Sequence, residues 1–139
     1  MNRTTIIAAV SDIVERTFEE TRALGNGATI QDMEDAVRRA TRQFGQLMIQ
    51  GQADEAGDGY VGSRIPCECG AIMRYISDRS RTVTTWCGQM TLERAYYRCD
   101  RCGASVVPLD KQLCMPEGHF SESIIKAISY CSDWDQRVS

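Results

Sequence analysis

The segments Cys67-Glu68-Cys69-Gly70 and Cys99-Asp100-Arg101-Cys102-Gly103 hold four of the seven cysteines of this 139-residue chain. Two thiolates one or two positions apart can bind one side of a tetrahedral Zn²⁺, and the glycine after each pair permits the tight turn that such binding needs. The sequence therefore predicts one structural zinc site, closed to water. Its predicted ligands are Cys67, Cys69, Cys99 and Cys102.

The spacing departs from the commonest four-cysteine pattern, because the first pair has a single intervening residue and 29 positions separate the pairs. A disulfide or unrelated buried cysteines are the alternative interpretations. Disulfides need an oxidising compartment, and the start of the chain does not resemble a signal peptide, so we expect reduced thiols and a cytoplasmic protein. The sequence contains no run of about 18 apolar residues, so we expect no membrane span. Cys87, Cys114 and Cys131 have no partner at ligand spacing, and we interpret them as small apolar residues or spare thiols.

Apolar residues recur at helical spacing on both sides of Gly25-Asn26-Gly27, which predicts an αα-hairpin. Thr29 and Asp32 have the spacing of a capping box at the start of the second helix. We predict an α+β fold: a helical hairpin over 1–50, a linker over 51–62, a small antiparallel β zinc ribbon over 63–110, and a short C-terminal helix and tail over 111–139. We expect the hairpin to support the rest of the chain; a homodimer through its remaining apolar surface is the other possibility.

Within the ribbon, β-forming residues predict strands over 71–76, 81–86 and 89–98, with a turn over 77–80. A short further strand is expected over 104–107, and Ser121 is placed to cap the final helix. His119, the only histidine, has no recognisable catalytic partner and is predicted to lie on the surface.

Positive charge is concentrated in the ribbon, since residues 61–103 carry seven arginines against four acidic residues. Arginine forks can bind phosphate or guanine edges, and aromatic rings can stack on bases, so DNA contacts are expected here. The alternative, left open, is that the aromatic residues form the small core and the arginines are ordinary surface. The candidate DNA-binding residues are Arg74, Arg79, Arg81, Arg94, Arg98, Arg101, Trp86, Tyr96 and Tyr97.

Three motifs together resemble the N-terminal region of bacterial insertion-sequence transposases of the Kra group. They are Ile65-Pro66-Cys67-Glu68-Cys69-Gly70, the run Leu92-Glu93-Arg94-Ala95-Tyr96-Tyr97 leading into Cys99, and Pro108-Leu109-Asp110. The resemblance implies a zinc-containing region that binds the terminal repeats of the element, ahead of an Asp-Asp-Glu catalytic domain that uses Mg²⁺. This chain ends before such a domain, so we expect a truncated or fragmentary chain that is not itself an enzyme. Cys114 departs from the pattern, in which glycine is expected after Leu113.

Two other classes of protein remain possible. One is a free-standing zinc-ribbon regulator, antitoxin-like or repressor-like, that binds DNA as a dimer. The other is a thiol redox protein using Cys99 and Cys102, although the βαβ setting of thioredoxin-like motifs is missing. The metal content of the purified protein separates these classes.

Overall fold

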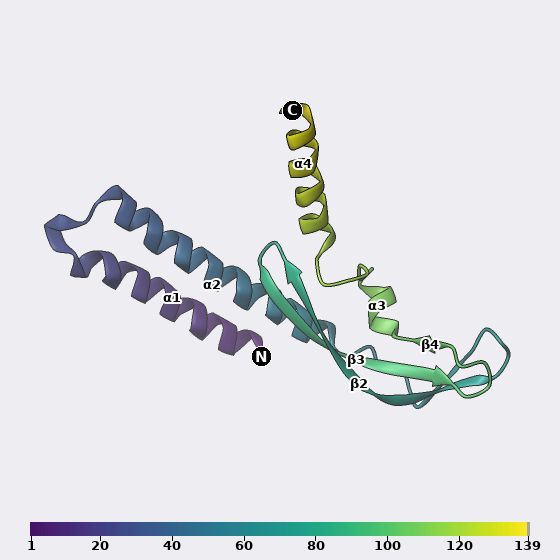
Figure 1. The fold of residues 1–139 in the computed structure, drawn as a ribbon. Coiled ribbons are helices and arrows are strands. Elements are labelled where there is room, and N and C mark those ends of the chain that lie inside the picture. Colours follow the sequence, from purple (N-terminus) through teal and green to yellow (C-terminus); the bar gives the residue numbers. More distant parts are fainter. Residues whose placement is uncertain (139) are drawn as a thin grey trace. The chain divides into compact units, whose positions relative to one another are not determined.

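The computed structural model describes residues 1–138, with side chains as far as residue 131, as a mixture of helices and strands (Figure 1). Contacts divide the chain into one unit made of Met1–Glu55 with Cys87–Gln89, and a second unit made of the rest. In the part of the chain that the structure describes, no helix is both long enough and apolar enough to span a membrane. The elements in order are α1 (Arg3–Ala23), the 3-10 turn η1 (Gly25–Gly27), α2 (Ile30–Ala56), β1 (Arg64–Pro66), β2 (Ile72–Thr85), β3 (Gly88–Cys99), β4 (Ser105–Val106), α3 (Pro108–Gln112) and α4 (Glu122–Val138).

The first unit contains the predicted helical hairpin, and its local signals act as expected. Gly25 adopts a left-handed conformation, φ 57°, immediately after α1. Thr29 Oγ1 accepts a hydrogen bond from the backbone N–H of Asp32 at 3.2 Å, and Asp32 Oδ2 accepts one from the N–H of Thr29 at 2.9 Å. This reciprocal pair is the predicted capping box, and it fixes the start of α2.

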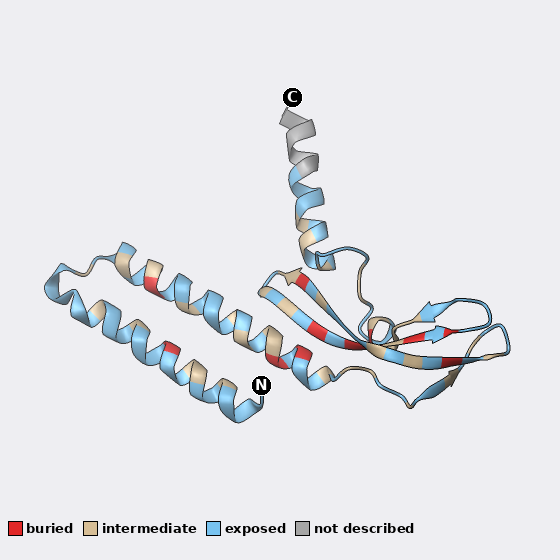
Figure 2. Cartoon of the chain, turned by 60° about the horizontal axis from the view of Figure 1, so that its bottom comes forward, coloured by how far each residue is buried: buried red, intermediate tan, exposed pale blue. Residues whose placement is uncertain are grey.

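The two helices of the hairpin pack through small and branched residues. Ile13 and Ala36 are buried, and a Cβ placed on Gly51 would come within 2.4 Å of Ile6 Cδ1. Glycine at position 51 therefore allows the helices to approach closely. Figure 2 shows how few residues of the hairpin are buried, which leaves much of its apolar surface exposed.

Residues 51–56, predicted as the first half of a linker, are instead the last turns of α2. Gln52 to Ala56 are helix-forming residues after a single glycine, and contacts with the start of α1 stabilise them. The terminal amino group of Met1 pairs with Asp54 at 2.9 Å, and Arg3 Nε pairs with Glu55 at 2.6 Å. The linker prediction gave too much weight to Gly51.

The second unit is built on a four-stranded antiparallel curled sheet in the order β1-β2-β3-β4. Arg64 of β1 lies opposite Arg74 of β2, and Tyr97 of β3 lies opposite Val106 of β4. β2 continues without a break through the residues for which we predicted a turn, so that prediction is wrong. Residues 77–80 are polar but include neither Gly nor Pro, and Tyr75 Oη donates to Asp78 within the strand at 3.0 Å.

Buried positions alternate along β3, but the alternation shifts by one residue. Leu92 and Arg94 are buried in the half near the β2–β3 turn, and Ala95, Tyr97 and Cys99 are buried in the other half. Successive side chains of a regular strand point to opposite faces, so the consecutive buried residues Arg94 and Ala95 mark the position where the pattern changes.

Residues 57–62, the second half of the predicted linker, are fixed to β2 and β3 by hydrogen bonds. The backbone N–H of Ala95 donates to Asp58 O at 2.8 Å, and that of Tyr75 donates to Ser63 O at 3.0 Å. Between these points the hydroxyl of Tyr97 accepts from the N–H of Val61 at 3.0 Å and donates to Gly62 O at 2.7 Å. The segment is therefore held on the second unit, although none of its residues is buried.

After β4 the chain forms α3, and its carboxylate Asp110 receives two arginines from the long strands. Arg94 Nη1 lies 2.5 Å from Asp110 Oδ2, and Arg81 Nη1 lies 3.4 Å from the same oxygen. Arg81 Nη2 also donates to the carbonyls of Pro116 and Gly118, at 2.7 Å for Gly118. This network holds the connection between α3 and α4 against the sheet.

A Schellman motif ends α3. The N–H of Cys114 bonds to Lys111 O at 3.3 Å, the N–H of Met115 bonds to Asp110 O at 2.9 Å, and Cys114 has φ 48°. Cys114 thus occupies the position that glycine normally fills. The predicted final helix begins one residue after Ser121, whose Oγ accepts from the N–H of Ile124 at 3.5 Å.

Candidate metal centre

Two similar hairpin turns carry the four predicted ligands. In the first, the N–H of Cys67 bonds to Ala71 O at 2.9 Å and the N–H of Gly70 bonds to Cys67 O at 3.0 Å. In the second, the N–H of Cys99 bonds to Ala104 O at 2.8 Å and the N–H of Gly103 bonds to Cys99 O at 2.9 Å. Gly70 and Gly103 have φ of 89° and 73°, which residues with a side chain rarely adopt.

The sheet brings the two turns together, because one turn joins β1 to β2 and the other joins β3 to β4. Cys67 Sγ lies 3.6 Å from Cys102 Sγ, and Cys69 Sγ lies 3.6 Å from Cys99 Sγ. All four sulfurs lie within 4.8 Å of one another. The predicted ligand set therefore forms one cluster that could hold a metal ion.

Two of the sulfur–sulfur distances are close to those of a tetrahedral thiolate site. With metal–sulfur bonds of about 2.3 Å, the edges of a tetrahedron of sulfurs measure about 3.8 Å, against 3.6 Å for these two pairs. A disulfide would need a sulfur–sulfur distance of about 2.05 Å, and all four cysteines are free. Cys99 is buried and Cys67 half-buried, whereas Cys69 and Cys102 lie at the surface, where an ion could enter.

The local backbone already favours one thiolate in this cluster. The N–H of Cys102, helped by that of Arg101 and opposed by burial, lowers the pKa of Cys99 to about 7. A hydrogen bond from the N–H of Cys69 lowers the pKa of Cys67. Burial and the three neighbouring thiols outweigh this effect and raise that pKa to about 12. The Cys67 thiol therefore keeps a proton that a bound dication would displace.

Three of the nine candidate DNA-binding residues are instead built into the second unit. Tyr97 has no exposed surface, and its hydroxyl is hydrogen-bonded to the backbone of Val61 and Gly62 in the segment 57–62. Arg94 is 9% exposed and Arg81 half-buried, and both bind Asp110. These side chains offer little surface to a nucleic acid. Tyr97 is a core residue, as in the alternative interpretation, whereas Arg81 and Arg94 are not ordinary surface arginines because Asp110 binds them inside the unit.

The remaining six candidates lie at or near the surface. Tyr96 and Arg98 alternate along β3 and so share one face of the strand, and the guanidinium of Arg79 stacks 3.6 Å from the centre of the Tyr96 ring. Arg101 lies exposed in the second cysteine turn, and Trp86 is 73% exposed at the β2–β3 turn. Arg74 is exposed but paired with Asp100.

The sequence analysis missed Tyr60 and Asp110. Tyr60 and Tyr75 meet edge-on with ring centres 5.1 Å apart, and the Tyr75 ring centre lies 5.8 Å from that of Tyr97, so the three rings form one aromatic cluster. Tyr60 lies in the predicted linker, where an aromatic residue between glycines could indicate packing. Asp110 gave no local signal, because its arginine partners come from distant strands.

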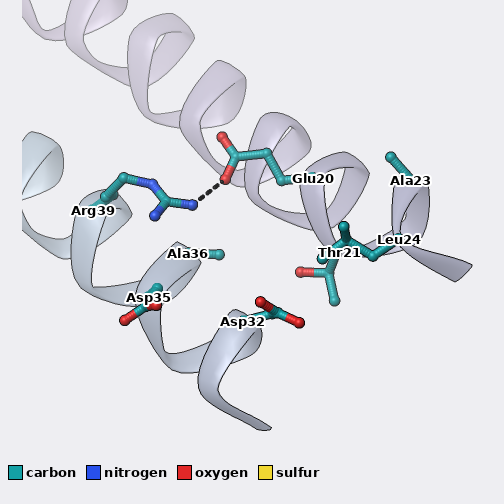
Figure 3. Close-up of a pocket in the computed structure, with 8 residues that line it drawn as sticks. All are labelled: Glu20, Thr21, Ala23, Leu24, Asp32, Asp35, Ala36 and Arg39. Carbon is teal, nitrogen blue, oxygen red and sulfur yellow. Dashed lines mark hydrogen bonds and ion pairs between the residues drawn. The ribbon is translucent and has the colours of Figure 1, made fainter. Parts of the chain in front are cut away.

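A hollow next to the turn between α1 and α2 is lined by three carboxylates, which Figure 3 shows. Each carboxylate already has a partner. Glu20 accepts from Arg39 at 2.9 Å, Asp32 accepts from Thr29, and Asp35 Oδ1 accepts from Gln31 at 2.9 Å. We therefore assign the hollow to helix capping and surface pairing.

Comparisons with protein-family models, with curated proteins and with solved structures found no match to this chain.

Proposed function

We propose that the cysteine cluster binds one Zn²⁺ and that the second unit is a structural zinc ribbon. The observation that carries this proposal is the convergence of four sulfurs from two separate hairpin turns within 4.8 Å. Four thiolates complete the coordination of zinc, so the ion leaves no position for water and plays a structural part. Coordination would join β1–β2 to β3–β4 across 29 intervening residues and stabilise a sheet that has a small core.

The arrangement of the sulfurs favours a shared metal over a redox dithiol. The two close pairs run between the turns, Cys67 with Cys102 and Cys69 with Cys99. A C-x-x-C redox centre would instead use Cys99 and Cys102 of the same turn, with a thioredoxin-like βαβ unit around them.

The zinc proposal is tested by metal content and by one ligand substitution. The purified chain should contain one Zn²⁺ per molecule. Cys99→Ser should release the ion and unfold residues 65–108, while circular dichroism still reports the helical hairpin. Cys87→Ser is the matched control, because this exposed thiol lies outside the cluster and its loss should leave the metal content unchanged. Full zinc retention in Cys99→Ser would reject the assignment.

We further propose that this ribbon binds DNA, as expected for the N-terminal region of an insertion-sequence transposase of the Kra group. The supporting features are the exposed Arg98 and Arg101, the stacked pair of Arg79 and Tyr96, and the exposed Trp86. Arginine forks and aromatic faces on a β-ribbon are suited to phosphate and base contacts. In this role zinc fixes the ribbon and the arginines contact the duplex.

Salt dependence tests the DNA proposal with a random-sequence duplex as the probe. If Arg98 and Arg101 contact phosphates, replacing each with alanine should reduce the slope of log affinity against log salt by about 0.9. Arg16→Ala, an exposed arginine on α1, is the control and should leave the slope unchanged. Binding that ignores both salt and these substitutions would exclude the ribbon as the DNA-binding surface, whether or not zinc is present.

A further inference from the structure

The helical hairpin exposes large apolar side chains along both helices. On α1, Ile7, Val14 and Phe18 are 65%, 48% and 67% exposed. On α2, the exposed side chains include Ile30 at 75%, Val37 at 55% and Phe44 at 46%. Ile7 and Val14 are seven residues apart, as are Ile30, Val37 and Phe44, and this spacing keeps each set on one side of its helix.

The two sets lie on the same side of the hairpin. Ile7 and Val14 each follow a residue that faces the other helix, because Ile6 packs against Gly51 and Ile13 is buried. Val37 likewise follows the buried Ala36. One residue is a rotation of about 100°, and in two antiparallel right-handed helices the same rotation away from their mutual contact turns toward the same face. We call this surface the apolar face.

The area of the apolar face is large enough for a stable interface. Met33 and Met48 of α2 extend it, with 47% and 38% of their surfaces exposed. With about 200 Å² for a large side chain, the eight residues expose on the order of 800 Å². A stable protein–protein interface buries roughly 800 Å² on each partner, whereas a patch of this size is unusual on a monomer.

The charges beside the apolar face fit a second copy of this chain. A shallow hollow on α2, formed by Ile30, Met33 and Val37, is bordered by Glu34 and Arg38, which lie one helical turn apart on the same flank. A border with one charge of each sign can pair with the same border rotated by a two-fold axis, while a strongly acidic or basic partner would meet repulsion at one of the two residues.

We propose that the apolar face binds the same face of a second copy, so that two hairpins form a four-helix bundle. A two-helix layer with one apolar face can bury it by adding a second such layer, and an identical chain supplies one. The inference uses only the first unit and does not depend on zinc or DNA binding.

Sedimentation of the full zinc-containing chain tests the proposal. The wild type should sediment at twice the chain mass of 15.6 kDa. Val37→Glu and Phe18→Glu each place a charge on the apolar face and should give monomers that keep their helical circular dichroism. Gln31→Glu is the control, since it adds the same charge to an exposed position on the far side of α2, and it should remain dimeric.

Two outcomes would overturn the proposal. One is a monomeric wild type at concentrations on the order of 100 µM, where an interface of this size should be saturated. The other is a dimer that persists in both glutamate variants. Should either variant fail to fold, the wild type still decides, because thermal unfolding of a dimer shifts to higher temperature as protein concentration rises. A helical transition independent of concentration would reject the dimer.

Discussion

Arg94 of β3 donates from Nη1 to Asp110 Oδ2 of α3 at 2.5 Å, across 16 positions of the chain. The Arg94 side chain is 11% exposed and that of Asp110 is 27% exposed. This ion pair, shared with Arg81, connects the long strands to the segment that follows them.

Replacing Asp110 with alanine should destabilise the second unit by about 2–4 kcal/mol. The substitution leaves two largely buried guanidinium groups without their anion, which costs more than the pair itself contributes. Urea unfolding followed by tyrosine and tryptophan fluorescence measures the change. Asp100→Ala is the control: its pair with Arg74 is well exposed, so less than about 1 kcal/mol should be lost. Equal effects of the two substitutions would contradict a buried network.

Removing the hydroxyl of Tyr97 should cost about 1–3 kcal/mol while the ring stays in place. Tyr97→Phe leaves the N–H of Val61 and the carbonyl of Gly62 without their partner, and a part-buried polar group left unpaired is destabilising. Tyr96→Phe on the same strand is the control, because it changes a ring outside this contact. Faster amide hydrogen exchange at Val61 in the first variant alone would support the role of the segment 57–62.

Zinc affinity should rise with pH, because the ion replaces protons on the thiols. The pKa of Cys99 is lowered to about 7, chiefly by the N–H of Cys102, so above that pH one ligand is already a thiolate. The slope of log affinity against pH should therefore decrease by about one as pH rises through 7, since one fewer proton is released. Competition with a chromophoric chelator measures the slope. The range from pH 6 to pH 8 covers about one unit on each side of the pKa of Cys99. A constant slope would contradict a lowered pKa at Cys99.

Acid should destabilise the helical hairpin through three carboxylates. Hydrogen bonds from the terminal amino group to Asp54, from Arg3 to Glu55 and from the N–H of Thr29 to Asp32 lower their pKa values below the ordinary 3.8 for Asp and 4.5 for Glu. A lowered pKa in the folded state adds stability above the unfolded-state pKa, and this stability is lost as pH falls through the folded-state value. The melting temperature of the helices, measured from pH 6 down to about pH 2, should begin to fall once the pH is below the ordinary pKa values of these carboxyl groups. Glu55→Gln should show a smaller decline than the wild type.

Cys114→Gly should stabilise the second unit by about 0.5–1 kcal/mol. The left-handed conformation costs a residue with a side chain about 1–2 kcal/mol, and glycine removes this strain. Glycine also has more conformational freedom in the unfolded chain, which offsets part of the added stability. Thermal unfolding of the zinc-loaded protein measures the shift. Cys114→Val provides the opposite case, because a β-branched residue at φ 48° should lower the melting temperature. A loss of stability in the glycine variant would show that Cys114 is not strained in the native protein.

Local signals in the sequence predicted much of the fold. Gly25 and the pair of Thr29 and Asp32 act within a few residues, so their effect on helix ends can be read directly from the chain. Four cysteines in two close pairs were enough to predict one cluster, because each pair with its glycine forms a turn by itself. The short strand over Ser105–Val106 follows from the second turn in the same way.

What the sequence could not show depends on residues that are far apart in the chain. Asp110 selects Arg81 and Arg94 from among seven similar arginines of the ribbon, and no local pattern distinguishes these two from Arg98. The end of α2 depends on Met1 and Arg3, which lie beside it in the fold but 53 and 52 positions earlier in the chain than their partners. The absence of a turn over 77–80 depends on cross-strand pairing, which overrides the polar composition of that segment.

The uninterrupted course of β2 also bears on the size of any DNA target. Fourteen residues at about 3.3 Å each give an arm about 45 Å long, longer than one helical turn of B-DNA at roughly 34 Å. An arm of that reach, lying along a groove, would occupy more than a single turn of duplex. If the ribbon binds DNA as we propose, its footprint should exceed ten base pairs, roughly the length of one turn, and shorter oligonucleotides would leave part of the arm without a contact.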